Sequence, residues 1–343
     1  MCRKFITLFN LLAISTMLLS SCKAPTPEEL DCANREVLCV SLVTGIEGIK
    51  DNSFNEATWE GVLKAKTDQV VDKVQYIETI DAKDYENNII TLADANFDVI
   101  VTVGKLYGEV TADVAKSYPG TLFIGVDQSQ VEVLPNLVGL VFHGDQSGFL
   151  AGVLSAQMTK TNTIAAVFGA ETDQSMVAIK EGYEAGAKYI NSNINLISTY
   201  YPGNKELAES DPSWGASIAE EAIKQGADVI FGTGGATGNG ALIETAQHPG
   251  LYCIGVDTDQ WASIPNAHPC LISSSMKLIA PGVYDLLELA KDGSLSGGNY
   301  YGVSGLSPFH ELDSVISLST KDVVNRVSKG LQDGSISSGT KLP

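Results

Sequence analysis

Eight short apolar runs, separated by longer stretches with helical spacing, dominate the chain after its first 36 residues. Most of these runs are continuously apolar, which is typical of parallel strands buried on both faces. The pattern therefore predicts repeated strand–helix–strand units and an α/β fold built on parallel sheets. The predicted strands are Val37–Thr44, Asp98–Val103, Leu122–Val126, Leu137–Phe142, Ile164–Phe168, Asp228–Phe231, Tyr252–Val256 and Leu271–Ser274.

Two of these strands recur farther along the chain at one fixed offset. Asp98–Gly104 (DVIVTVG) matches Asp228–Gly234 (DVIFGTG), and residues 123–128 (FIGVDQ) match residues 253–258 (CIGVDT), both 130 positions later. Chance similarity between buried strands is the alternative, but two matches with the same offset favour an internal repeat. The sequence therefore predicts two similar α/β lobes.

The repeat places one acid at the same point in each lobe, because Asp127 and Asp257 both follow directly after a predicted strand. In open parallel sheets, ligands bind beyond the carboxyl ends of the strands. An aspartate in this position is often only a turn cap. Its occurrence in both lobes favours a ligand cleft with one carboxylate on each wall.

The first 21 residues are predicted to be a signal peptide. Arg3 and Lys4 precede the apolar segment Phe5–Leu19, which is too short to span a bilayer. The segment ends in Leu19-Ser20-Ser21-Cys22, which resembles the lipobox of bacterial lipoproteins. We expect lipidation at Cys22 and a polar tether over residues 22–36. The alternative is an ordinary secretory signal.

Four further cysteines, Cys32, Cys39, Cys253 and Cys270, remain in the exported chain and allow three disulfide pairings. The local pairs Cys32–Cys39 and Cys253–Cys270 are the expected ones, with buried free thiols as the alternative. A zinc site is not expected, because the chain has no CxxC motif and its four histidines are scattered.

The net charge of the chain argues against two classes of binding partner. The 343 residues include 22 Lys+Arg and 41 Asp+Glu, a formal charge of −19. Nucleic-acid binding and electrostatic attachment to anionic lipid both need clustered basic residues, so neither is expected. The length suggests about two domains.

Recognisable catalytic and cofactor motifs are missing from the sequence. The glycine-rich stretch 232–240 follows a strand, but no Lys-Ser/Thr completes a phosphate loop and the GxGxxG spacing is interrupted at Thr237. Neither GxSxG nor HExxH occurs. We therefore expect no enzyme activity, no cofactor and no metal.

Two predicted helix starts carry aromatic residues that could reach the cleft. Ser53 and Glu56 fit a capping box, which places Phe54 and Asn55 in the first turn of a helix. In the other lobe, Asp211-Pro212 begins a helix with Trp214 in its first turn. These two rings could clamp a flat ligand, although each could equally pack on its own lobe.

Several motifs occur in order along the chain: the lipobox, Asp51–Asn55 (DNSFN), Gly148–Gly152 (GFLAG), Gly182–Gly186 (GYEAG), residues 226–231 (GADVIF), Gly238–Gly240 (GNG), residues 254–260 (IGVDTDQ) and Ser307–His310 (SPFH). Together they resemble the basic membrane protein (BMP) family of bacterial lipoproteins, which includes purine nucleoside receptors of ABC importers. The resemblance covers about residues 36–340.

This resemblance implies a type I periplasmic-binding-protein fold, with three crossovers between the lobes and a nucleoside in the cleft. Phe54 is then expected to stack on the base with Asn55 beside it, and Asp127 to bind the base edge. Asp257 and Lys277 are expected to bind the ribose, and Gly235 to leave room for it.

Two departures from the family pattern affect the expected site. Nucleoside-binding members often have an aspartate after the first strand, where this chain has Val43-Thr44-Gly45. They also have an aromatic before the Asp-Pro pair, where this chain has Ala208-Glu209-Ser210. Glu47 and Trp214 are the candidate replacements.

The sequence therefore predicts a lipid-anchored, extracytoplasmic receptor that acts as a monomer and passes a nucleoside to an ABC permease. A receptor for a sugar or signalling molecule, or a surface antigen with a vestigial cleft, is the alternative. Lobe 1 is expected over residues 37–142 plus about 271–308. Lobe 2 is expected over residues 143–270 plus about 309–343.

Overall fold

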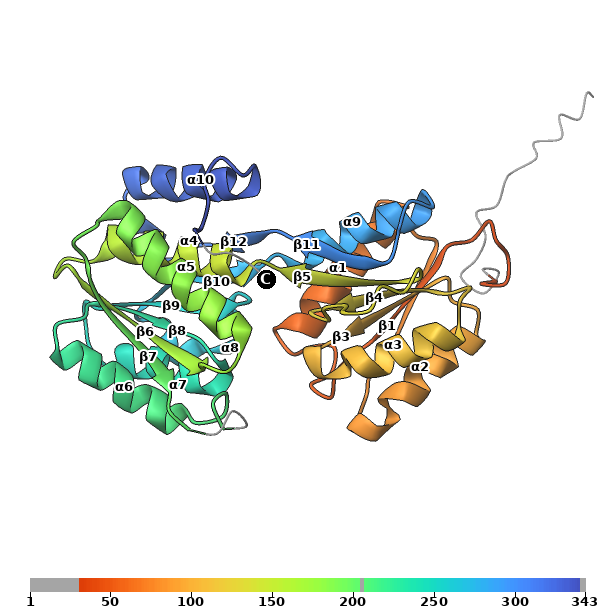
Figure 1. Ribbon diagram of the computed structural model, residues 1–343, viewed down its shortest axis with the longest axis horizontal. Helices are drawn as coiled ribbons and strands as arrows, with labels where there is room; N and C mark the ends of the chain where they lie inside the picture. Colours follow the sequence, from red (N-terminus) through yellow and green to blue (C-terminus); the bar gives the residue numbers. More distant parts are fainter. Residues whose placement is uncertain (1–30, 204–206, 340–343) are drawn as a thin grey trace, which may run out of the picture.

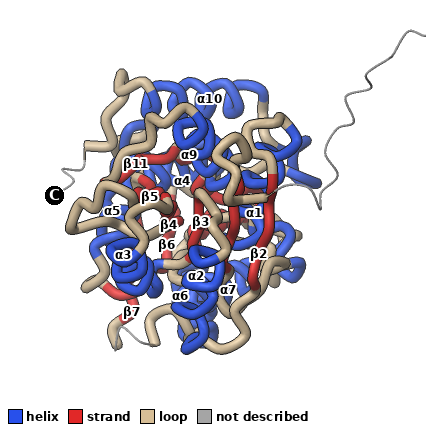
Figure 2. The backbone as a smooth tube through the Cα atoms, turned by 90° about the vertical axis from the view of Figure 1, so that its right-hand side faces the viewer, coloured by secondary structure: helices blue, strands red, loops and turns tan. Residues whose placement is uncertain are grey.

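The computed structural model describes residues 31–203 and 207–339 and consists of two lobes that lie side by side (Figure 1). Each lobe is built on a six-stranded, mostly parallel sheet, so the predicted α/β class is confirmed. Viewed along the long axis, the strands lie in the interior with helices around them (Figure 2). The predicted signal peptide, Cys22 and the start of the predicted tether lie outside the described residues.

Lobe 1 has the strand order β2-β1-β3-β4-β5-β11, with all neighbouring strands parallel. Helices α1 and α9 cover one face of this sheet, and α2 and α3 cover the other. The elements are β1 (Cys39–Val43), α1 (Phe54–Thr67), β2 (Lys73–Ile77), the 3₁₀ turn η2 (Ala82–Asp84), α2 (Tyr85–Asp94), β3 (Val99–Val103), η3 (Lys105–Tyr107), α3 (Gly108–Ser117), β4 (Leu122–Val126), β5 (Leu137–Phe142), α9 (Ile279–Lys291) and β11 (Gly298–Gly302).

Lobe 2 repeats this arrangement with the order β7-β6-β8-β9-β10-β12, in which only the short β12 is antiparallel to its neighbour. Helices α4, α5 and α10 pack on one face of the sheet, and α6 and α7 on the other. The elements are α4 (Gly144–Met158), β6 (Thr163–Ala170), α5 (Gln174–Ile190), β7 (Asn195–Tyr201), α6 (Pro212–Lys224), β8 (Val229–Gly232), α7 (Gly235–Thr245), β9 (Tyr252–Asp257), α8 (Gln260–Ser263), η4 (Pro265–Ala267), β10 (Leu271–Lys277), β12 (Ser304–Leu306), η5 (His310–Val315) and α10 (Leu318–Gln332).

The chain passes between the lobes three times, and the crossing points correct one predicted boundary. The passages lie between β5 and α4, between β10 and α9, and between β11 and β12. The expectation that all of residues 271–308 belong to lobe 1 is wrong. Strand β10 pairs with β9 and buries Ile272 in the core of lobe 2, and β12 pairs with β10. Only α9 and β11 return to lobe 1.

Helices α4 and α5 approach each other closely because each places two glycines, one turn apart, against the backbone of the other. A β-carbon on Gly148 would lie 2.0 Å from the carbonyl oxygen of Ile179, and one on Gly152 would lie 2.0 Å from that of Tyr183. Gly182 and Gly186 face the backbone of α4 in the same way. The sequence motifs GFLAG and GYEAG thus form one helix–helix contact, because only glycine lets two backbones come this near.

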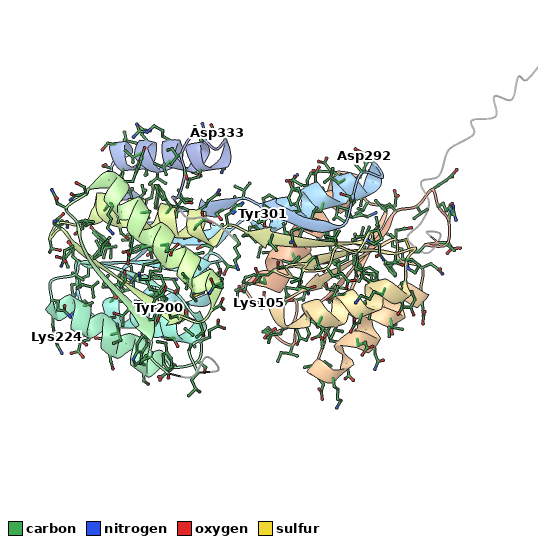
Figure 3. The ribbon with its side chains drawn as sticks, in the orientation of Figure 1. Lys105, Tyr200, Lys224, Asp292, Tyr301 and Asp333 are labelled. Carbon is green, nitrogen blue, oxygen red and sulfur yellow. A yellow bond between two sulfur atoms is a disulfide. The ribbon has the colours of Figure 1, made fainter. Side chains whose placement is uncertain are left out.

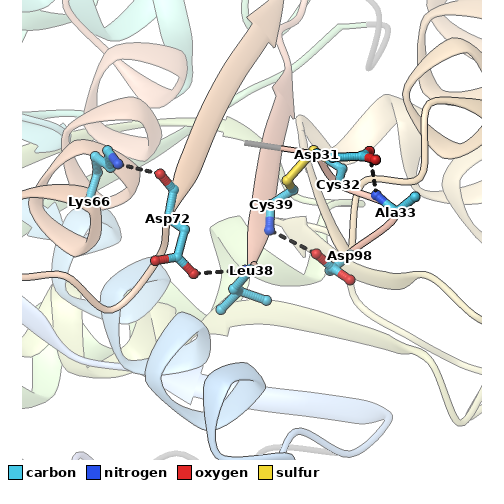
Figure 4. The surroundings of a disulfide bond; sticks show 8 residues. All are labelled: Asp31, Cys32, Ala33, Leu38, Cys39, Lys66, Asp72 and Asp98. Atoms are coloured by element: carbon cyan, nitrogen blue, oxygen red, sulfur yellow. Dashed lines mark hydrogen bonds between the residues drawn. A yellow bond between two sulfur atoms is a disulfide. The ribbon is translucent and has the colours of Figure 1, made fainter. Parts of the chain in front are cut away.

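The four cysteines of the described residues form the disulfides Cys32–Cys39 and Cys253–Cys270. The first joins the segment before β1 to the first residue of that strand (Figure 4). Beside it, the backbone N–H of Cys39 donates to the carboxylate of Asp98 over 2.8 Å. These contacts fix the amino end of β1, at the opposite end of the strand from the candidate site.

Within residues 31–203 and 207–339, none of the helices combines the length and the apolar character needed to cross a bilayer.

Candidate functional site

Asp127 and Asp257 occupy equivalent places in the two lobes, as the repeat predicts. Asp127 directly follows β4 and Asp257 ends β9. Both backbones are left-handed, with φ of 59° and 68°. This conformation is uncommon for residues other than glycine, and its occurrence at both positions shows that the two strand ends share one turn geometry.

Lys277 connects the two carboxylates across the lobes. Its Nζ lies 3.0 Å from Oδ1 of Asp127 in lobe 1 and 3.3 Å from Oδ1 of Asp257 in lobe 2. The same ammonium lies 5.0 Å from the centre of the Phe54 ring, which is cation–π distance. Four residues singled out from the sequence therefore meet at one point between the lobes.

The charge of Lys277 is fixed by this environment. Burial opposes the ammonium, but the negative charges of Asp257 and Asp127 outweigh it and raise the pKa of Lys277 above its ordinary value. The lysine therefore stays protonated at neutral pH and donates hydrogen bonds only.

Two cavities that are lined by residues of both lobes adjoin this group. The larger is about 600 Å³, and Phe54 and Asp127 line it. The smaller is about 290 Å³, lies beside Lys277, and is bounded by α1, the segment 258–262 and the start of α9. The larger is of a size that holds small-molecule ligands in proteins.

Asp51, rather than the predicted Ser53, caps the helix that carries Phe54. The Ser53 side chain makes no cap hydrogen bond. Instead the Asp51 carboxylate accepts from the backbone N–H groups of Ser53, Asn55 and Glu56. A carboxylate caps more than one free N–H, so it replaces the predicted capping box and fixes the first turn of α1 at the cavity.

Asn55 borders the larger cavity but has little free surface, since it is only 2 % exposed. Its Oδ1 accepts from the N–H of Gly45 over 3.0 Å, and its Nδ2 donates to Asp51 over 2.9 Å. Both ends of the amide are thus engaged in holding the loop after β1 against α1. The geometry assigns Asn55 to the support of the site.

Glu47 occupies the space that a side chain at position 45 would need. A β-carbon on Gly45 would lie 2.6 Å from Oε2 of Glu47, and Glu47 lines the larger cavity. Burial and the negative charge of Glu47 together raise the pKa of the neighbouring Tyr107 phenol. Of the two candidate replacements named above, Glu47 therefore does lie at the cavity.

Trp214 does not line either inter-lobe cavity formed by the described residues, which corrects its predicted role. Asp211 caps α6 and places Trp214 in the first turn as expected. However, the indole packs edge-on against Tyr201, with ring centres 4.9 Å apart, and on the core under α6. Burial of its apolar surface against its own lobe governs its position.

Gly235 also has a structural reason to be glycine. Its φ is +59°, and a β-carbon would lie 2.7 Å from the backbone oxygen of Glu209. The space it leaves is therefore filled by the segment before α6, which corrects the expectation that Gly235 leaves room for a ligand's sugar.

Among the cavity residues missing from the sequence-based set are Lys105, Leu106, Tyr107 and Glu209. The first three follow β3, so the rule that ligands bind at carboxyl strand ends points to this loop. No such rule identifies Glu209, which reaches the cavity from the segment before α6.

Comparison with known proteins places this geometry in a family. Residues 39–325 match the Bmp family, described as ABC transporter substrate-binding protein PnrA-like. The "ABC transporter nucleoside-binding protein BmpA" of Lactococcus lactis subsp. cremoris is 27% identical over 345 residues, covering 95% of this chain and 96% of that one. "Basic membrane protein A" of Borreliella afzelii is 32% identical over 305 residues, covering 84% and 89%.

Solved structures agree on the fold. An ABC transporter solute-binding protein from Conexibacter woesei superposes with a TM-score of 0.72 at 21% sequence identity, covering 90% of this chain and 99% of that one. At this identity the likeness establishes the fold alone, and it confirms the type I periplasmic-binding-protein architecture.

Proposed function

Because the chain belongs to the Bmp family of PnrA-like ABC transporter substrate-binding proteins, we propose that it binds a nucleoside, preferably a purine nucleoside, between its two lobes and delivers it to a permease. Members of this family are extracytoplasmic solute-binding proteins rather than enzymes. The identity of the ligand and the roles of the site residues are the proposal.

The observation that carries the proposal is the meeting of Phe54, Asp127, Asp257 and Lys277 between the lobes. An aromatic face suits a flat base, and stacking of this kind contributes about 1–3 kcal/mol per base. Asp127 accepts from donors on the base edge, while Asp257 accepts from ribose hydroxyls and Lys277 donates to the sugar. This division of acceptors and donors suits a ligand with a ring at one end and hydroxyl groups at the other.

The charge of the larger cavity favours an uncharged ligand. Among the described residues that line it are Glu47, Asp51, Asp127 and Glu209, against a single lysine, Lys105. A phosphate group in this cavity would lie near several carboxylates, and repulsion of like charges is costly away from bulk water. We therefore expect nucleosides to bind and nucleotides to be rejected.

In this proposal, closure of the two lobes makes the protein selective for a nucleoside over ribose alone. A hinge at the three crossovers lets the lobes close on the ligand. Carboxylates and ammonium that lose water on closure must be satisfied by the ligand, and each unmade hydrogen bond costs about 1–3 kcal/mol. Ribose alone satisfies part of this set and leaves Phe54 without a base. Binding of this kind needs one chain, so we propose that the protein acts as a monomer.

Phe54 takes the base without a partner ring from Trp214 in this proposal. Glu47 supplies a carboxylate next to the first strand in place of a side chain at position 45. The base is therefore held by one aromatic face and by carboxylates at its edge.

Attachment to the membrane through a lipid on Cys22 is the remaining part of the proposal. It rests on the sequence Leu19-Ser20-Ser21-Cys22 after an apolar segment. Mass spectrometry of the mature N-terminus should find Cys22 as the first residue with acyl groups attached. A mature chain that begins elsewhere, or an unmodified Cys22, would contradict it.

Thermal unfolding of residues 23–343 with a panel of ligands tests the nucleoside proposal. A ligand at 100 times its Kd adds about 2.7 kcal/mol of stability, which raises the melting temperature. We expect a rise with guanosine, adenosine or inosine, and none with ribose, the free bases or the nucleoside 5′-monophosphates. If only sugars raise the melting temperature, the ligand is a sugar rather than a nucleoside. If no compound raises it, the result would support a vestigial cleft.

A further inference from the structure

A second ion pair joins the lobes, on a residue of the larger cavity and away from the hinge. Nζ of Lys105 lies 3.1 Å from Oδ2 and 3.4 Å from Oδ1 of Asp173. Lys105 begins η3 after β3, and Figure 3 shows it on the side of lobe 1 that faces lobe 2. Asp173 is the N-cap of α5 in lobe 2. The contact therefore exists only while the lobes are close together.

The acceptor side of this pair is held in place before the lobes meet. Asp173 is 8 % exposed, and its Oδ1 accepts from the backbone N–H of Ser175 over 2.9 Å and from the Ser175 hydroxyl over 2.8 Å. These bonds fix the carboxylate so that Oδ2 faces Lys105. Burial opposes its charge, but the bonds from Ser175 and the charge of Lys105 outweigh it and lower the pKa of Asp173. The carboxylate is therefore ionised at neutral pH.

The donor side is free to move. The Lys105 side chain is 60 % exposed, and its lysine stem can follow the lobe as it opens. An ammonium on a long flexible stem makes and breaks such contacts at low cost compared with a buried pair. The pair is thus built from a fixed acceptor on one lobe and a mobile donor on the other.

The sheet order places the Lys105–Asp173 contact farther from the crossovers between the lobes than the contacts of Lys277. Lys277 ends β10, two residues before the start of α9, and so lies next to a crossover. Lys105 follows β3, which is two strands away from the crossover strand β5. At about 4.8 Å per strand, the distance is about 10 Å. Opening about the crossovers therefore separates Lys105 from Asp173 more than it separates Lys277 from Asp127.

We infer that Lys105 and Asp173 form a latch that holds the two lobes closed and slows the release of the ligand. Both are positioning residues, since they act through the lobe arrangement. The inference goes beyond the proposed function, because closure of the lobes can be measured whatever the ligand is. Loss of the latch shifts the closure equilibrium about two- to fivefold, the range that partly exposed ion pairs give.

Small-angle X-ray scattering on the full-length mature protein, without added ligand and at low salt, tests the latch. The variants are Lys105→Met, Asp173→Asn and the double variant. Asn at 173 keeps an acceptor for Ser175, so α5 stays capped. We expect each single variant to have a larger radius of gyration than the wild type, and the double variant to match them, because one interaction is lost in every case.

The matched control is the pair Lys83–Asp81, which is exposed and lies wholly within lobe 1. Lys83→Met should leave the radius of gyration unchanged. High salt should expand the wild type toward the variants, because screening weakens the pair. Equal radii for wild type and single variants at low salt would overturn the latch, and so would additive effects in the double variant.

Once a ligand is identified, its dissociation rate provides a second readout. The latch predicts release about two- to fivefold faster from both single variants. Faster release from Lys105→Met alone would overturn it, because Lys105 would then act by touching the ligand. A protein that binds no nucleoside leaves the scattering test intact, so failure of the proposed function and failure of the latch are distinguishable.

Discussion

Replacement of Gly152 by alanine is expected to lower the free energy of unfolding by about 3 kcal/mol, the upper end of the usual cost of overpacking. The added methyl carbon would lie 2.0 Å from the carbonyl oxygen of Tyr183. That oxygen belongs to the backbone of α5, so it cannot rotate away as a side chain does. The two helices must move apart, which opens the packed face of the lobe 2 sheet.

The same reasoning applies to Gly186, whose β-carbon would lie 2.1 Å from the carbonyl oxygen of Phe149. In an exposed helix, alanine in place of glycine is favourable by about 1 kcal/mol. Helix propensity alone would therefore predict a gain in stability, whereas the close contact predicts a loss, so the sign of the change distinguishes the two. The effect also reaches the hinge, because α4 begins directly after the first crossover.

Urea unfolding, followed by circular dichroism, gives the measurement. The matched control is Gly108→Ala at the first residue of α3, where the nearest atom to the new carbon is 3.5 Å away and φ is −60°. It should be neutral or slightly stabilising. If Gly152→Ala and Gly108→Ala have the same midpoint, the account of the α4–α5 contact is wrong.

The second large effect is expected from Lys277→Met, which should weaken ligand binding at least 100-fold. The ammonium lies within 3.3 Å of carboxylates from both lobes. Without it, Asp127 and Asp257 meet on closure with no positive charge between them. The three side chains are partly exposed in this structure, and closure on a ligand would bury them. Removal of one partner from a buried ion pair costs about 3–5 kcal/mol, which corresponds to a factor of 100 or more.

Lys277→Arg is the matched comparison, since it keeps the charge and changes its shape. We expect it to bind the ligand more weakly than wild type but more tightly than Lys277→Met. Calorimetric titration of the three proteins with the same nucleoside measures the difference. Affinity of Lys277→Met within threefold of the wild type would remove Lys277 from the site.

The buried strands could be predicted from the sequence, but the edges of the sheets could not. All eight predicted strands occur, because their apolar runs are buried on both faces. Four others were missed: β2, β7, β11 and β12. Strand β2 is partly exposed along its length, β11 is rich in glycine and tyrosine, and β12 has three residues. Each lies at the edge of its sheet and has only one neighbouring strand. An edge strand is covered less than a central strand, so its sequence lacks the continuous apolar run that predicts a buried strand.

The residues of the candidate site also differ in how far the sequence alone could identify them. The repeat alone led to Asp127 and Asp257, and their shared backbone geometry bears out their equivalence. Lys277 came only from the family resemblance, because no periodicity distinguishes it. Trp214 was misplaced because a helix start fixes where a residue lies along the chain but leaves open whether its ring turns to the cleft or to the core.

The contact between Lys105 and Asp173 could not be predicted from the sequence. Lys105 and Asp173 are 68 residues apart and belong to different lobes. Neither belongs to a motif, and their contact depends on how the lobes are placed relative to each other. Pairings of this kind follow from tertiary arrangement, which local spacing does not encode.

Calorimetric titration of purified, refolded residues 23–343 with inosine, beside the variant Asp127→Asn, tests the central claim most directly. Refolding removes any nucleoside carried through purification. The account predicts saturable binding of one inosine per chain, and binding at least tenfold weaker in the variant, in line with loss of a charge-assisted hydrogen bond. The absence of binding to inosine, guanosine and adenosine, or equal affinity in both proteins, would contradict a nucleoside held between the two lobes.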